Sequence, residues 1–201
     1  GSGGGGGATD LNGLSDVTIT AGVQPSAYFI NIPASATGTY NTVIGADAAN
    51  SMVGSAKNTI LGYGAGASWS DNFGGNVIIG NNALRSATNQ VGNCVAIGES
   101  AGYSNGNAYT SVLIGSAAGR QGSSAYGGVC IGSNAGRSVN STYGIFIGSL
   151  AGYSGGGSFS IAMGYNSARD ATGGSNGQHN ISLGYESLRY NTNGNRNVVL
   201  G

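Results

Sequence analysis

Few side chains in this 201-residue chain could take part in acid–base catalysis. His179 is the sole histidine, and nothing in the sequence places a second titratable group beside it. Catalysis requires titratable groups that converge on one site, and a glycosidase-type carboxylate pair would arise only if neighbouring chains brought two acidic residues together. The acidic residues are scattered along the chain: Asp10, Asp16, Asp47, Asp71, Glu99, Asp170 and Glu186.

Motifs for metals, phosphates and disulfides are also missing from the sequence. Cys94 and Cys130 have no metal-ligand spacing and occupy different repeat positions, so we expect two small buried side chains without a disulfide. Residues 62–66 (GYGAG) lack the spacing and the following helix of a phosphate-binding loop. No aspartate recurs as calcium-binding repeats require. The sequence therefore predicts a protein that is not an enzyme, with no catalytic residue, cofactor or metal site.

Aromatic side chains in the polar connections are better candidates for binding. Aromatic rings surrounded by Asn and Ser suit the faces of sugars. The candidate ligand contacts are Trp69, Phe73, Tyr109, Tyr126 and Tyr143. Stacking between successive repeats or between subunits is the alternative for Tyr109, Tyr126, Tyr143 and Phe159.

Charge is sparse and balanced. Seven Lys and Arg residues offset seven Asp and Glu residues, so we predict no nucleic-acid binding. No apolar run approaches the ~18 residues of a membrane span, so we predict no membrane insertion. Five arginines recur at one repeat position, where they form either a structural ladder or a ligand-binding stripe: Arg85, Arg120, Arg137, Arg169 and Arg189.

A glycine-ended phrase, repeated ten times, must position these side chains. It begins as residues 41–45 (NTVIG) and ends as residues 197–201 (NVVLG), with glycines 16 to 20 residues apart. Near-periodic self-similarity is the signature of a solenoid. The repeated glycine should permit a special backbone conformation or the close approach of the next rung, and a small residue three positions later should fit a tight inner corner. Each rung should hold at least two short strands.

The three residues before each glycine predict which side chains face inward. The first and third are regularly aliphatic or β-branched, whereas the second is mixed. Since alternate residues of a strand share a face, we assign the regular columns to the interior and the mixed column to the outside. An outward apolar column requires burial against other copies of the chain. The sequence thus predicts a homotrimer with a seam at Val43, Ile60, Ile78, Leu113, Cys130, Phe146 and Val199.

The repeats resemble those of two families of extracellular fibres. Residues 94–102 (CVAIGESAG), 111–119 (SVLIGSAAG) and 128–136 (GVCIGSNAG) resemble the SVAIGxxA repeats of trimeric autotransporter adhesin heads. Residues 184–197 are similar to the GYxALxxNTTGxxN pattern of bacteriophage tail fibres and related tail proteins. The adhesin-head repeat is shorter than the present one, and no stalk or membrane anchor is visible in the sequence. The resemblance therefore favours the phage fibre.

The resemblance implies an all-β fold: a single-stranded left-handed parallel β-helix, or β-roll solenoid, of about ten rungs of 16 to 20 residues. It also implies an intertwined or side-by-side homotrimer. Residues 1–9 are a predicted Gly-rich linker, residues 10–40 hold N-terminal strands or a cap, and residues 41–201 form the solenoid. Solenoids normally cap their terminal rungs, so we expect this one to continue beyond residue 201.

The implied function is that of the structural shaft and host-attachment segment of a phage tail fibre, a non-catalytic virion adhesin. Its expected partners are further copies of itself, other tail-fibre or tail proteins, and a polysaccharide or protein receptor on the host cell surface. Its expected location is extracellular, in the virion. The alternative is a bacterial trimeric autotransporter-type adhesin head at the bacterial cell surface.

Overall fold

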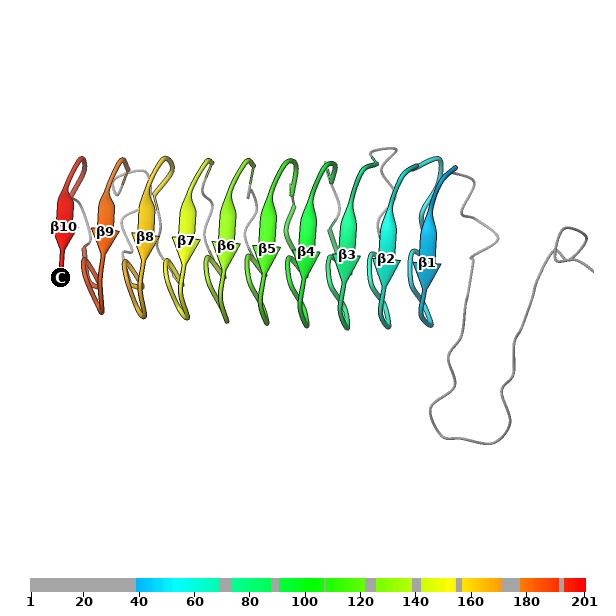
Figure 1. The fold of residues 1–201 in the computed structure, drawn as a ribbon, viewed down its shortest axis with the longest axis horizontal. Helices are drawn as coiled ribbons and strands as arrows, with labels where there is room; N and C mark the ends of the chain where they lie inside the picture. Colours follow the sequence, from blue (N-terminus) through cyan, green and yellow to red (C-terminus); the bar gives the residue numbers. More distant parts are fainter. Residues whose placement is uncertain are drawn as a thin grey trace, which may run out of the picture.

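The computed structural model describes residues 39–68, 74–87, 91–106, 108–121, 126–138, 142–154, 157–170, 178–191 and 194–201. The predicted linker and nearly all of the predicted N-terminal cap lie outside these residues. The described part of the chain is a rod of ten strands stacked in sequence order (Figure 1). The strands are β1 (Thr42–Ile44), β2 (Thr59–Leu61), β3 (Val77–Ile79), β4 (Val95–Ile97), β5 (Val112–Ile114), β6 (Val129–Ile131), β7 (Ile145–Ile147), β8 (Ile161–Met163), β9 (Ile181–Leu183) and β10 (Val198–Leu200).

The ten strands form one parallel sheet in which each strand pairs with the next in sequence. The pairing keeps every repeat column in register; Val112 of β5, for example, lies opposite Val129 of β6. Nine intervals of about 4.8 Å give a sheet about 43 Å long. The prediction of an all-β parallel solenoid with rungs of about 17 residues is confirmed.

Among the described residues, each rung contains one strand rather than the two or more expected from its length. Turns follow the repeated glycines from Gly45 to Gly184, and positive φ angles recur at the second and fourth residues of these turns, as at Ser100 (55°) and Gly102 (61°). This alternation excludes an extended strand from the turn segments. Hydrogen bonds between rungs hold the turns instead, such as the one from the Gly102 amide to the Ala118 carbonyl (2.8 Å).

The repeated glycine forms the corner at the end of each strand. Gly98 has a φ of 132°, a conformation that L side chains rarely adopt. A Cβ at Gly98 would also lie only 2.6 Å from the carbonyl oxygen of Gly115 in the next rung. Both expected reasons for this glycine are therefore confirmed, because each corner is strained for other residues and packs directly on the next.

The interior of the rod is lined by the middle residue of each strand and by the small residue after each corner. Ala101, Ala118 and Ala135 are fully buried, as expected for an inner corner. The predicted assignment of the two strand faces, however, is wrong: the mixed column lies inside the coil, and the regular columns lie outside. Val43, Ile60, Ile78, Leu113, Cys130 and Phe146 are buried inside their own coil, and Val199 is half-buried in the same column of β10. The seam predicted at these residues is therefore wrong.

The interior column varies in size, and in the rungs of β5 and β7 a glycine of a second column makes room for a large side chain. A Cβ at Gly119 would lie 2.7 Å from Cδ2 of Leu113, and one at Gly152 would collide with the ring of Phe146. A large side chain in the strand is thus accommodated by a glycine four residues after the corner. Alternation alone does not identify the inner face, because local adjustments of this kind allow the side chains of the inner column to vary in size.

Buried amide side chains reinforce the stacking at the start of the first rungs. Oδ1 of Asn41 accepts hydrogen bonds from the backbone and side-chain nitrogens of Asn58, both at 3.0 Å. Asn58 accepts the same pair from Asn76 at 3.0 Å, and Asn76 accepts the backbone amide of Cys94 at 2.9 Å. Such ladders satisfy buried polar groups and hold neighbouring rungs in register.

The interior becomes polar in the rungs of β8 and β9. The hydroxyl of Ser182 lies 2.8 Å from that of Ser167 and 2.6 Å from that of Ser187. A cavity of about 10 Å³ lies nearby, between Phe146, Ala162 and Ser182. The small side chains of these rungs therefore fill the coil less completely than Leu113 and Phe146 fill earlier rungs.

Candidate interaction surfaces

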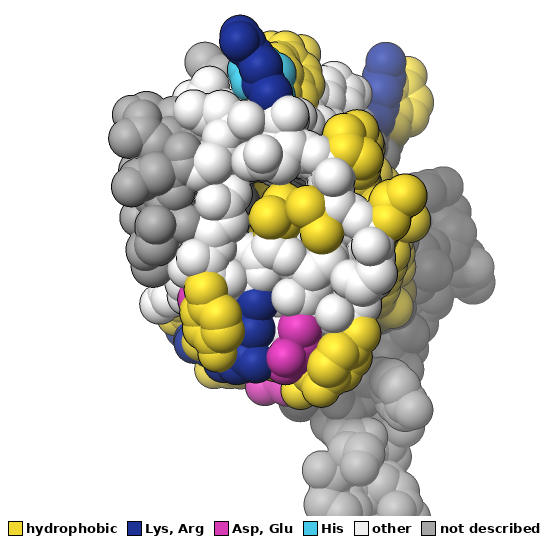
Figure 2. Space-filling model, turned by 90° about the vertical axis from the view of Figure 1, so that its left-hand side faces the viewer, with side chains coloured by type: hydrophobic (Ala, Val, Ile, Leu, Met, Phe, Trp, Pro, Cys, Tyr) yellow, Lys and Arg dark blue, Asp and Glu magenta, His cyan; other side chains and the backbone are white. Residues whose placement is uncertain are grey.

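The outer face of the sheet is a continuous apolar surface. It consists of the first and last residues of all ten strands, which are aliphatic or Met except for Thr42 and Thr59. Leu61 is 43% exposed and Met163 is 41% exposed. Hydrophobic side chains line this side of the rod, at the right of the end-on view (Figure 2). We call this surface the outer sheet face.

A ladder of aromatic rings runs along the corner where the chain enters the later strands. Tyr109 and Tyr126 stack with ring centroids 5.5 Å apart, and Tyr126 meets Tyr143 edge-on at 5.8 Å. Phe159 continues the ladder at 5.6 Å from Tyr143 and stacks on His179 at 5.2 Å. At these positions the rings therefore pack between successive rungs, which is the alternative to ligand contact that the sequence left open.

This stacking changes what the aromatic candidates can bind. Tyr109 and Tyr126 stack on each other, and Tyr143 packs between Tyr126 and Phe159, so fewer of these ring faces are open to a sugar. Trp69 and Phe73 lie outside the described residues. Sugar contact at these five positions stays a prediction.

The recurrent arginines belong to a second column, in which Tyr103 and Tyr153 stand between some of them. The Arg120 guanidinium carbon lies 5.3 Å from the ring centroid of Tyr103. Tyr153 lies between Arg137 and Arg169, at 5.5 and 5.6 Å from their guanidinium carbons. Cation–π contacts of this kind are attractive, so the column is a structural ladder over much of its length. The sequence already indicated this ladder, because Tyr103 and Tyr153 share the repeat position of the arginines.

Among the described residues, carboxylates form ion pairs with the arginines near β8 and β9. Nε of Arg189 lies 3.6 Å from Asp170, and Nε of Arg169 lies 3.8 Å from the same carboxylate. Arg189 also donates to Glu186 at 2.5 Å. Arg85, near the other end of the column, donates to the neutral side chain of Asn82 at 2.8 Å and lies 5.9 Å from the ring centroid of Tyr63.

The two cysteines are free thiols inside the coil, as expected. Burial raises the pKa of Cys94 and of Cys130 from 9.0 to about 12, which keeps both thiols protonated and unreactive at neutral pH. Among the described residues, no three His, Cys, Asp or Glu side chains come together as metal ligands would. That part of the chain also has no helix long and apolar enough to span a membrane.

Comparisons with protein-family models, with curated proteins and with solved structures find no match to this chain. Its function must therefore be argued from its own surfaces.

Proposed function

We propose that this chain is the shaft and host-attachment segment of a phage tail fibre, built as a homotrimer of left-handed coils that associate through the outer sheet face. It is proposed to act in the virion without catalysis, together with other tail proteins and a polysaccharide or protein receptor on the host surface. The outer sheet face is the observation that carries this proposal.

Further copies of the same chain are suitable partners for the outer sheet face, because two identical regular surfaces can pack against each other. Its residues repeat at the strand spacing of about 4.8 Å along roughly 43 Å. Two identical rods can therefore match rung for rung, with aliphatic side chains from one lying between those of the other. An isolated coil this thin buries little surface, and association of rods in the same direction supplies the missing apolar contact.

The solution mass tests this assembly. The wild-type chain is expected to have three times its monomer mass of 19.6 kDa in analytical ultracentrifugation. Ile114→Lys combined with Ile131→Lys places two charges on the outer sheet face and should give monomers. The matched control is Ser104→Lys with Ser154→Lys, which adds the same charges beside the arginine column. A wild-type monomer, or a double-lysine variant of the outer face that stays trimeric, would contradict the proposed assembly.

Location distinguishes a phage fibre from the alternative of a bacterial adhesin head. Antibodies against the purified chain should label phage particles rather than the envelope of uninfected bacteria. The purified trimer should also compete with phage particles for adsorption to host cells. Labelling of the bacterial envelope alone would replace the phage fibre with the bacterial adhesin.

A further inference from the structure

The arginine column contains two junctions where arginines occupy consecutive rungs, Arg120–Arg137 and Arg169–Arg189. The two junctions differ in the charges that surround them. Arg120 and Arg137 occupy consecutive rungs, and the amide of Gln121 donates to the Arg137 carbonyl at 2.6 Å, which keeps the two residues in register. Their tyrosine neighbours lie on the outer sides of the pair, Tyr103 next to Arg120 and Tyr153 next to Arg137. We call Arg120 and Arg137 the arginine pair.

No carboxylate of the described residues forms an ion pair with the arginine pair, in contrast to Arg169 and Arg189. Arg137 donates through Nη1 to the hydroxyl of Tyr153 at 2.9 Å and to Oδ1 of Asn134 at 3.4 Å. Both partners are neutral. Two like charges in neighbouring rungs repel each other, and partial burial strengthens that repulsion.

Both side chains of the arginine pair are half-buried, and the stack covers part of each guanidinium group. Nε of Arg120 and Nε of Arg137 are buried and have no hydrogen-bond partner in the described part of the chain. Nε of Arg169 and Nε of Arg189 also lack a hydrogen bond there, but they lie 3.8 and 3.6 Å from the Asp170 carboxylate. Partial burial removes water that would otherwise screen the charge, so an incoming anion gains more than it would at a fully exposed arginine. Each side chain is only partly buried, so part of it remains open to solvent.

We propose that the arginine pair binds an oxyanion carried by an acidic saccharide, namely a carboxylate or a sulfate ester. Arginine is suited to such groups because its planar fork offers parallel N–H donors. Exposed polar side chains beside the pair, Ser104, Gln121 and Ser138, can donate to or accept from neutral sugar hydroxyls. The choice of a saccharide as the carrier of the oxyanion rests on the proposed function in host attachment. The oxyanion site itself does not depend on that function.

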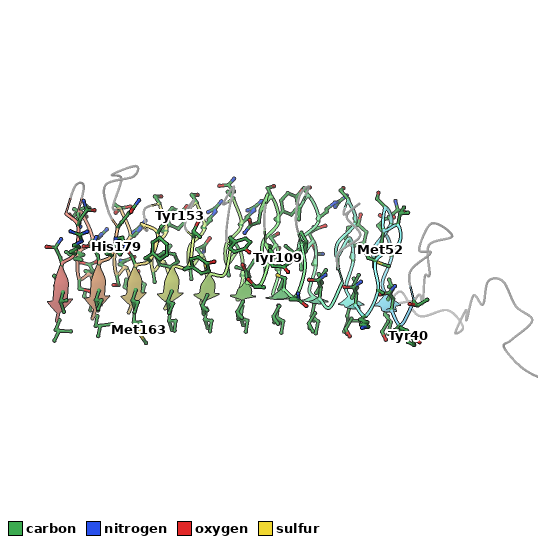
Figure 3. All side chains as sticks on the ribbon, turned by 90° about the horizontal axis from the view of Figure 1, so that it is seen from above. Tyr40, Met52, Tyr109, Tyr153, Met163 and His179 are labelled. Carbon is green, nitrogen blue, oxygen red and sulfur yellow. The ribbon has the colours of Figure 1, made fainter. Side chains whose placement is uncertain are left out.

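The position of the column leaves this site open in the proposed assembly. Tyr153, which contacts Arg137, lies on the other side of the strands from Met163 of the outer sheet face (Figure 3). Association through that face therefore leaves the arginine pair exposed to ligands. A trimer would present three copies of the site around the rod, which increases avidity for a polymer.

Calorimetric titration with an oligogalacturonate at low ionic strength tests the proposal. Arg120→Gln combined with Arg137→Gln should weaken binding about tenfold, the effect of losing a charge-assisted contact. Arg169→Gln combined with Arg189→Gln changes the net charge equally and should leave binding within about twofold. A neutral malto-oligosaccharide of the same length should not bind measurably. Equal weakening by both double variants would overturn the proposal, because it would show a general charge effect.

Thermal unfolding with inorganic sulfate separates the oxyanion site from its saccharide source. Sulfate should raise the unfolding temperature of the wild type more than that of the Arg120→Gln, Arg137→Gln variant, because it relieves repulsion that the variant lacks. Equal shifts would overturn the site. Selective stabilisation by sulfate without binding of oligogalacturonate would overturn the proposal that a saccharide carries the oxyanion. The proposed shaft function would be unaffected, because solution mass and location test it separately.

Discussion

The two faces of the same ten strands follow opposite rules. The inner column ranges from Ala96 to Phe146 in size, and a glycine four positions after the corner makes room for its large side chains at Leu113 and Phe146. The outer columns are almost uniform, although no other part of the described chain covers them. Regularity in a solenoid repeat therefore does not identify the core. A coil can adjust its own interior rung by rung, whereas a face that pairs with identical rods must be uniform along its length.

The strongest test of this contrast compares neighbouring residues of β7. Phe146→Ala should lower the free energy of unfolding by about 3–5 kcal/mol, because it leaves a cavity in the coil. Ile147→Ala on the outer sheet face should cost less than about 1 kcal/mol when both are measured by urea denaturation in the monomeric Ile114→Lys, Ile131→Lys background. Similar losses at the two positions would show that the faces do not differ as described.

The glycine corner keeps the two faces oriented, and a substitution there should have the next largest effect. Gly115 has a φ of 127°, and a Cβ would lie 2.6 Å from the carbonyl oxygen of Gly132. Gly115→Ala should therefore cost at least about 2 kcal/mol, measured by urea denaturation. Ser116→Ala, one residue later on the exposed side of the turn, is the control and should be nearly neutral.

The buried thiols extend the contrast to pH. Because burial raises both pKa values from 9.0 to about 12, the folded state retains protons that the unfolded state loses. The free energy of unfolding should thus be constant with respect to these thiols below pH 9 and fall between pH 9 and about 12, by at most about 1.4 kcal/mol per pH unit for each thiol. Urea denaturation of a Cys94→Ala, Cys130→Ala variant should show a shallower slope across this range; an identical slope would contradict it.

The polar rungs offer the smallest test. Ser182→Ala removes the central hydroxyl of a buried group of three serines and should cost about 1 kcal/mol in thermal or urea unfolding. Ser116→Ala again serves as a control, since that side chain is exposed. A gain in stability would contradict this expectation, because it would show that the Ser182 hydroxyl does not stabilise these rungs.

The sequence predicted the solenoid, its repeat length, the glycine corners, the small inner residues and the buried thiols, because each follows from a column of residues with one conformational or steric requirement. It did not predict which strand face is inside, because strand alternation is symmetric and the compensation between Phe146 and Gly152 spans six residues. It missed the cation–π ladder because Tyr103 and Tyr153 interrupt the arginine pattern that drew attention. The prediction of a second strand in each rung was wrong, because the number of residues in a rung does not determine their backbone φ angles.

The strand register survives unequal repeat lengths. Ile145 pairs with Ile161, sixteen residues later, and Ile161 pairs with Ile181, twenty residues later, with no shift in the sheet. Chain length between rungs is therefore uncoupled from the geometry of the rod. Evolution or a protein engineer can lengthen one connection and alter what the rod displays at that height, while the outer sheet face and the spacing of all other rungs stay as they are.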